Sequence, residues 1–164
     1  MNISSVNIRN GRPSDHPKVL SVILEWWEGR DLRSNAKRVF FDHFSDTIFI
    51  AEVNNDLVGF IIGFLSQSKP KEAYIHLVGV RPDMRELGLG SLLYINFIEA
   101  CHRYGRSIFQ CCTSIMNKKS IEFHQRIGFS IEPGEGIIDG IPVSYSYYGQ
   151  DSPMVLFRKE VPKS

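Results

Sequence analysis

The stretch that decides the fold joins an apolar segment to an amphipathic one. It reads Val78-Gly79-Val80-Arg81-Pro82-Asp83-Met84-Arg85-Glu86-Leu87-Gly88-Leu89-Gly90. The glycines at 88 and 90 leave the backbone N–H groups of this turn without side chains that would block close approach. Together with the dipole of the helix that begins here, those donors predict an anion site suited to a diphosphate. The alternative is a glycine-rich helix start that serves only tight packing of helix against sheet.

Strands precede this turn and a helix follows it. The β-rich runs 47–53 and 57–65 flank Asn54-Asn55-Asp56, which predicts a hairpin. Residues 73–80 form the next predicted strand. Apolar residues at helical spacing then predict a helix over 88–104, with Tyr104 on its inward stripe.

The remaining elements are predicted from capping residues and apolar spacing. Before the hairpin we expect a strand over 3–9, a helix from Ser14 or Asp15 to near Gly29, and a helix over 35–44. In that last helix Val39, Phe40 and Phe44 are expected to face inward. After the turn we expect a strand over 107–113, a helix from Asn117 to about Arg126, strands over 129–132 and 154–161, and a turn-rich segment between those two strands.

These elements predict an α/β fold of the α+β kind, organised as one domain over residues 1–164. Its centre is a mixed sheet of about six to seven strands flanked by about four helices. Because the strand over 107–113 follows a helical crossover, we expect it to lie parallel to the strand over 73–80.

Composition excludes several classes of partner and site. Lys and Arg number 19 against 18 Asp and Glu, so no global field favours nucleic acid or an anionic membrane. No uncharged apolar stretch is long enough to span a membrane, and the N-terminus lacks a signal-peptide pattern, so we expect a cytoplasmic protein. Cys101, Cys111 and Cys112 are expected to be buried thiols, and the histidine spacing predicts no metal site.

Two familiar nucleotide-binding folds do not fit the turn. A Rossmann fold has its glycine turn after the first strand and an acidic residue about twenty positions later, whereas at least three strands come before this turn. The nearest acidic candidate, Glu99, lies inside the predicted helix and not at the end of a strand. A phosphate-binding P-loop is excluded because no Gly-Lys-Ser or Gly-Lys-Thr is present.

The sequence resembles the GNAT superfamily of acetyl-CoA-dependent N-acetyltransferases. Residues 85–90 look like the family's Arg/Gln-x-x-Gly-x-Gly/Ala motif, and residues 78–82 are similar to its strand end. A second motif is carried by Asn117, Ser120, Phe123, His124, Gly128 and Phe129. The resemblance covers nearly the whole chain.

The resemblance implies a site for acyl-CoA between the strands 73–80 and 107–113, which splay apart after Val80. The pantetheine arm is expected to pair with the backbone of Val78 and Val80, and Gly79 to permit a bulge that aims an N–H at the thioester oxygen. Asn117 is expected to reach the same arm. The implied cofactor-binding residues are Val78, Gly79, Val80, Arg85, Glu86, Leu87, Gly88, Leu89, Gly90, Ser91, Asn117 and Ser120.

Two histidines are the candidate catalytic residues. His124 stands where the family commonly has a tyrosine that donates a proton to the departing thiolate, and the alternative is that it only packs. His76 is the candidate base, sharing a strand face with Tyr74, Val78 and Val80 if the strand is regular. The alternative is a satisfied core histidine.

The acceptor pocket is predicted from aromatic residues. Trp27 and Tyr74 are the candidate substrate-binding residues. Tyr145, Tyr147 and Tyr148, in the loop before the last strand, suggest a lid or a homodimer contact, the alternative being a loop pinned by its own rings.

The sequence thus predicts an enzyme that moves an acetyl group from acetyl-CoA to a primary amine of a small molecule, with no metal. The amine attacks the thioester directly. The alternatives are an acetyltransferase for protein N-termini or lysines and a non-catalytic acyl-CoA-binding sensor.

Overall fold

A computed structural model describes residues 3–149 and 152–162. The backbone divides into two compact units, one up to Arg106 and one from Ser107 onward. The single domain over 1–164 stays a prediction, as do the parallel pairing and the splay of strands that belong to different units.

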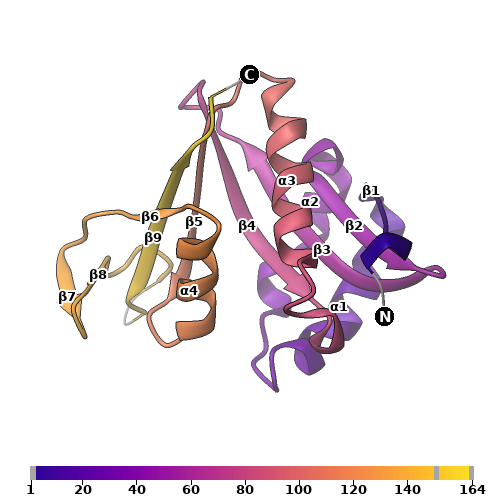
Figure 1. The fold of residues 1–164 in the computed structure, drawn as a ribbon, viewed down its shortest axis with the longest axis horizontal. Coiled ribbons are helices and arrows are strands. Elements are labelled where there is room, and N and C mark those ends of the chain that lie inside the picture. The colour runs from indigo at the N-terminus through magenta and orange to yellow at the C-terminus, as the bar shows by residue number, and fades with distance from the viewer. Residues whose placement is uncertain (1–2, 150–151, 163–164) are drawn as a thin grey trace. The chain divides into compact units, whose positions relative to one another are not determined.

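The first unit contains a four-stranded antiparallel sheet in which neighbours in the chain are neighbours in the sheet (Figure 1). Its strands are β1 (Asn7–Asn10), β2 (Ile48–Val53), β3 (Asp56–Leu65) and β4 (Glu72–Val80). Between β2 and β3, Asn54 and Asn55 have φ of 51° and 68°, the left-handed values that a tight hairpin turn requires. The predicted hairpin is therefore confirmed.

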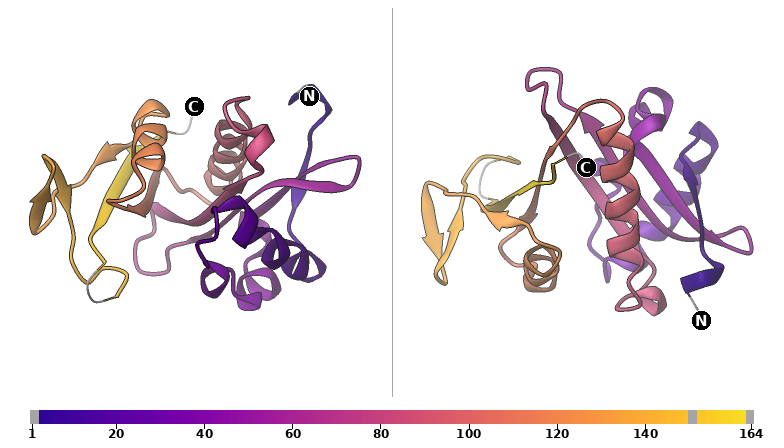
Figure 2. Two further views of the ribbon diagram at one scale, coloured as in Figure 1. Left: turned by 90° about the horizontal axis from the view of Figure 1, so that it is seen from below. Right: turned by 45° about the horizontal axis from the view of Figure 1, so that its top comes forward.

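Helices cover both faces of this sheet. α1 (His16–Trp26) and α2 (Arg38–His43) lie on one face, and α3 (Leu89–His102) lies on the other, as the left view of Figure 2 shows for this unit. Single 3-10 turns precede or link these elements: η1 (Ile3–Ser5), η2 (Pro13–Asp15), η3 (Arg33–Asn35), η4 (Ser45–Thr47) and η5 (Pro82–Met84). A buried apolar core lies between α1, α2 and the sheet, around Trp26, Phe41 and Phe60.

Three sequence predictions for this unit were wrong in detail. Residues 3–5 form a helical turn, so the first strand starts only at Asn7. α2 starts at Arg38, after a separate turn, and buries Phe41 while Val39 is 51% exposed. α3 ends at His102, so Tyr104 lies outside its stripe, and its hydroxyl donates to the Asp46 carboxylate at 3.1 Å.

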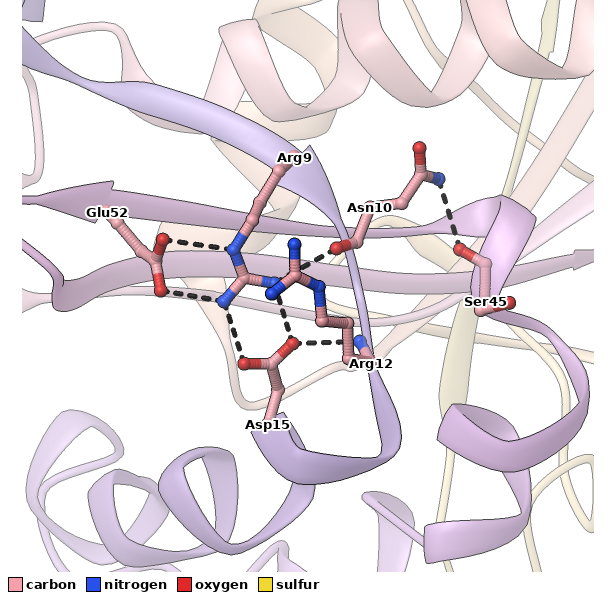
Figure 3. A network of polar contacts seen from close by, with 6 residues as sticks. All are labelled: Arg9, Asn10, Arg12, Asp15, Ser45 and Glu52. Atoms are coloured by element: carbon pink, nitrogen blue, oxygen red, sulfur yellow. Dashed lines mark hydrogen bonds and ion pairs between the residues drawn. The ribbon is translucent and has the colours of Figure 1, made fainter.

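An ion-pair network fixes the first strand to its surroundings (Figure 3). The guanidinium of Arg9 in β1 donates to both oxygens of Asp15 at 2.8 Å and to the carboxylate of Glu52 in β2 at 2.7 and 3.0 Å. Asp15 also accepts the backbone N–H of Arg12 at 2.8 Å. This network joins β1, β2 and the start of α1 through one buried carboxylate.

The second unit pairs its strands in the order β5 (Ile108–Ser114), β9 (Met154–Glu160), β6 (Ser130–Ile131), all antiparallel. Its helix is α4 (Lys118–Arg126), and β7 (Gly136–Ile138) and β8 (Ile141–Val143) form a separate hairpin. The four strands of the first unit and these three strands together number seven, and the described chain has four α-helices. Both numbers agree with the predicted six to seven strands and about four helices. The mixed α/β fold class is confirmed.

Further sequence expectations concern burial and membrane spans. Cys101 and Cys111 are buried as predicted, and Cys112 is half-buried. Across residues 3–149 and 152–162, we find no helix with the length and apolar character needed to traverse a bilayer.

Candidate functional site

The turn between β4 and α3 presents a run of open backbone amides. Its backbone turns sharply, with φ of 64° at Glu86 and 90° at Gly88, the residue that caps α3. For the part of the chain that the structure describes, no hydrogen bond is donated by the amides of residues 86–91, and the first paired amide is that of Leu92, which donates to the Gly88 carbonyl at 3.0 Å. The left-handed turns and the helix dipole therefore concentrate positive potential at one place.

We call this turn the amide cradle (residues 86–91), and among the described residues little surrounds its central glycine. Gly88 is exposed, and a Cβ added to it would contact only the Cδ1 of Ile3, at 3.6 Å. Leu87 points its side chain to the surface, 42% exposed. The cradle therefore has the donors and the access that an anionic group needs.

Arg85, an exposed residue directly before the cradle, bonds to the ends of two elements. Its guanidinium donates to the carbonyl of Val80 at 3.2 Å and to that of Trp26, and it lies 4.0 Å from the carboxylate of Glu28. These bonds tie the end of β4 to the end of α1. A contact between the Arg85 side chain and a ligand stays a prediction.

The predicted bulge at Gly79 is wrong. The register of β4 against β3 slips between Leu77 and Ile75, so His76 is the extra residue, whereas Gly79 pairs regularly with Phe60. Gly79 instead makes room for two rings: a Cβ there would lie 2.5 Å from the ring of Phe60 and 2.8 Å from that of Trp27. A glycine is required at this position by packing.

The bulge also changes which residues of β4 share a face. Gly79 faces the side of the sheet covered by α1, so Val78 and Val80, its neighbours in the alternation, face the α3 side. His76 stacks on a ring of α2 and thus faces the α1–α2 side, as does Tyr74 two residues before it. The expectation that Tyr74 and His76 share a face with Val78 and Val80 is therefore wrong, because the strand is not regular.

His76 is half-buried and oriented by its neighbours. Its Nε2 lies 2.8 Å from the carbonyl of Asn35, and its ring stacks on Phe40 with centroids 4.6 Å apart. Since a carbonyl only accepts, Nε2 carries the hydrogen and the basic lone pair of the neutral ring is on Nδ1. Burial lowers the pKa of His76, and the bond to Asn35 opposes that only in part, so the neutral form prevails at pH 7. Neither neighbour was predicted. Both come from the segment 33–44, and the sequence of that segment does not indicate that it contacts His76.

In the second unit, Asn117 and Ser120 form the start of α4. The Oδ1 of Asn117 accepts the backbone N–H of Ser120 at 3.2 Å, which confirms the predicted cap. Any contact of these two residues with acetyl-CoA stays a prediction. Nearby, Lys118 forms an ion pair with Asp139 at 3.3 Å.

His124 is buried among aromatic rings of its own unit. It stacks on Phe157 with centroids 4.7 Å apart and meets Phe123 and Phe129 edge to face. Its Nδ1 lies 2.6 Å from the carbonyl of Ser120, so Nδ1 carries the hydrogen of the neutral ring. Burial lowers the pKa of His124 despite this bond. Such an imidazole is held neutral at pH 7, with its lone pair on Nε2.

The other aromatic candidates divide by burial. Trp26 belongs to the core and Trp27 is partly buried beside it. A contact between Trp27 and the substrate stays a prediction. Tyr145, Tyr147 and Tyr148 are exposed, and the backbone N–H of Tyr145 donates to Glu135 at 2.9 Å. A role for these tyrosines as lid or dimer contact stays a prediction.

Metal-ligating side chains do not gather anywhere in the described ranges: no group of three or more His, Cys, Asp or Glu is placed to hold an ion.

We compared the sequence with models of known protein families and with known proteins. The model of the acetyltransferase (GNAT) family matches residues 15–129. An uncharacterised N-acetyltransferase of Methanocaldococcus jannaschii is 30% identical over 139 residues, which cover 77% of this chain but only 62% of that protein. An L-methionine sulfoximine/L-methionine sulfone acetyltransferase of Pseudomonas aeruginosa is 26% identical over 140 residues, covering 77% of this chain and 81% of the relative.

Solved structures share the fold. Ard1 from Thermoplasma volcanium superposes with a TM-score of 0.78 at 22% identity, over 97% of this chain and 99% of that one. A putative acetyltransferase of Salmonella typhimurium, solved with acetyl-CoA, gives a TM-score of 0.68 at 15% identity, over 98% and 96% of the two chains.

Proposed function

Because the chain belongs to the acetyltransferase (GNAT) family, we propose that it is an enzyme that transfers the acetyl group of acetyl-CoA to a primary amine of a small molecule. The observation that carries this proposal is the amide cradle, whose six consecutive amides donate no hydrogen bond among the described residues. Backbone donors at a helix start match the diphosphate of CoA in charge and geometry.

Acetyl-CoA would be held by backbone groups of the first unit. The cradle would bind the diphosphate, and Val78 and Val80 would pair with the pantetheine arm as one strand pairs with another. Since the bulge lies at His76, the backbone N–H that meets the thioester oxygen belongs to the segment 76–78 and not to Gly79. Bound acetyl-CoA supplies an electrophilic acyl carbon.

His76 is the residue best suited to accept the proton of the amine. In the proposed reaction the amine nitrogen bonds to the acyl carbon and the bond from that carbon to sulfur breaks, which requires the amine to lose its ammonium proton first. The neutral ring with its lone pair on Nδ1 can take that proton directly or through water.

His124 is poorly suited to donate a proton to the thiolate. Its Nδ1 hydrogen is bonded to the Ser120 carbonyl, and donation from Nε2 would need the imidazolium form, which burial disfavours. These contacts support the alternative that His124 only packs, here between α4 and Phe157 of β9.

The small-molecule acceptor rests on the relatives. One of them is named for the acetylation of methionine sulfoximine. Acetylation of protein N-termini or lysines and binding of acyl-CoA without chemistry are the competing functions.

A thiol-release assay tests the proposal. Wild type, His76→Ala and His124→Phe are incubated with acetyl-CoA and either a panel of small amines or peptides with free N-termini and lysines. We expect thiol release with a small amine, a loss of about 100-fold in kcat for His76→Ala, and little change for His124→Phe. His43→Ala, an exposed histidine of the same unit, is the matched control. Release with peptides alone, or CoA binding without release, would establish a competing function.

A further inference from the structure

Five half-buried rings of the first unit form a continuous surface, which we call the aromatic strip: His76, Phe40, Phe44, Phe64 and Tyr74. Each ring contacts the next in that order, with centroid distances of 4.6, 5.7, 6.0 and 5.5 Å. The first and last of these contacts are stacked, with interplanar angles of 25° and 27°. The strip is therefore a chain of ring contacts contributed by α2, the residue that follows α2, β3 and β4.

The strip differs from the core rings of the same unit. Phe41, Phe60 and Phe97 are fully buried, whereas every ring of the strip retains an exposed part. Its rings lie at the rim of the core, on the α1–α2 side of the sheet, where they can stack on a further flat group.

The position of the strip along β4 links it to the proposed reaction, and the inference rests on that proposed function. The cradle and then Val80 and Val78 mark the expected course of the CoA arm. His76 lies two residues beyond Val78, about 7 Å along the strand. The strip thus begins where the acetyl end of the arm is expected.

Two carboxylates that border the strip have cationic partners. Asp42 of α2 pairs with Arg38 at 3.2 Å, and Glu72 at the start of β4 pairs with Lys69 at 3.3 Å. The rings of the strip themselves carry no charge at pH 7, and the carboxylate of Asp46, two residues after Phe44, accepts the Tyr104 hydroxyl at 3.1 Å.

We propose that the aromatic strip binds the side group of the acceptor, and that the acceptor is an arylalkylamine: a primary amine joined by a short chain to a flat aromatic ring. The ring stacks on the strip and the amine reaches the Nδ1 side of His76. An aliphatic diamine or a polar amino acid lacks the flat apolar group that this surface favours.

The test compares 2-phenylethylamine with 2-cyclohexylethylamine, which has a similar size but no flat ring, and with 1,4-diaminobutane. We expect kcat/KM to be at least about tenfold higher for 2-phenylethylamine. Equal or lower kcat/KM for the aromatic amine would overturn the inference.

Variants of the strip supply a second readout. Phe64→Leu removes a ring of β3 whose ring contacts are with Phe44 and Tyr74, and Tyr74→Leu removes the ring at the far end of the strip from His76. For each variant we expect KM for 2-phenylethylamine to rise about five- to tenfold, with a smaller change in kcat. Tyr104→Leu removes an exposed ring outside the strip and should leave KM unchanged. Thermal unfolding identifies a variant that has lost its fold, and an unchanged KM in a folded variant would contradict the inference.

Calorimetry with 2-phenylethylamine in the presence of CoA separates the two proposals. Binding that Phe64→Leu weakens, in a protein that acetylates no amine, would refute the proposed function and support the strip. If the protein acetylates aliphatic amines and the strip variants do so at the wild-type rate, the proposed function is supported and the role of the strip is refuted.

Discussion

The helices α3 and α4 begin in opposite ways. α3 starts at Gly88 with no side-chain cap in the described structure, so the cradle amides depend on an acceptor from outside. α4 starts at Asn117, whose side chain accepts the Ser120 amide. The third helical residue is a serine in both, Ser91 and Ser120, so the difference lies in the capping residue. An uncapped start can bind an anion, whereas a capped start is satisfied within the chain.

The largest effect is expected from Gly88→Ala, because the left-handed φ of 90° opposes any side chain and a relaxed turn would misplace the cradle amides. Calorimetry should show that the affinity for CoA falls about 100-fold, because one or two hydrogen bonds to the charged diphosphate are lost. Gly105→Ala is the matched control, since Gly105 follows the other end of α3 with φ of 74° and open space around it. Equal losses of affinity in both variants would show that strain alone, and not the cradle, is responsible.

The second-largest effect is expected from a negative charge at the third residue of each helix, which distinguishes the start of α3 from that of α4. Ser91→Asp should weaken CoA binding about tenfold by repelling the diphosphate, while its favourable place near the helix dipole preserves stability. Ser120→Asp should stabilise α4 similarly with a smaller effect on CoA. If titration calorimetry finds the larger loss for Ser120→Asp, the diphosphate belongs at α4 instead.

Asn117 separates capping from ligand contact. Asn117→Ala should lower the free energy of unfolding by about 1 kcal/mol, because the Ser120 amide loses its acceptor. Asn117→Asp keeps an acceptor and should retain stability in chemical denaturation. A loss of CoA affinity in the folded Asn117→Asp variant would establish the predicted contact through the amide nitrogen, and unchanged affinity would exclude it.

The smallest effect concerns pH. The pKa of His124 is lowered in the folded protein by burial, so the folded state binds its proton less readily than the unfolded state does. Its neutral form carries no penalty above about pH 6.5, and stability is lost as pH falls from there towards the folded pKa. His124→Phe should flatten the decline in unfolding free energy between pH 7.5 and 5.5. His76 contributes with the same sign, so the difference between wild type and variant is the informative quantity; a difference of zero would mean that His124 is not buried as neutral imidazole.

Local signals in the sequence predicted the elements that frame the site. The Asn54-Asn55 turn, the glycine that starts α3 and the asparagine that caps α4 are each recognised from a few adjacent residues, because the backbone conformation they favour depends on those residues themselves. The cradle was predicted for the same reason.

Features that depend on distant contacts were not predictable. A glycine at 79 is compatible with a bulge, but its absent Cβ serves the rings of Phe60 and Trp27, which come from other elements. The bulge at His76 instead shifts the face of half a strand, and no period-two pattern reveals that. The inward face of α2 was also missed, because packing selects Phe41 over Val39.

The two carbonyls that Arg85 bonds set what a residue at this position has to supply. The side chain at this position has to donate two N–H groups, one to a carbonyl at the end of β4 and one to a carbonyl at the end of α1. Arginine does so with its guanidinium, and glutamine carries the same pair of hydrogens on a single amide nitrogen. That nitrogen, however, stands where arginine has Nε, two bonds short of the Nη2 that reaches Trp26, so glutamine here would keep the bond to Val80 and lose the one that ties this turn to the end of α1.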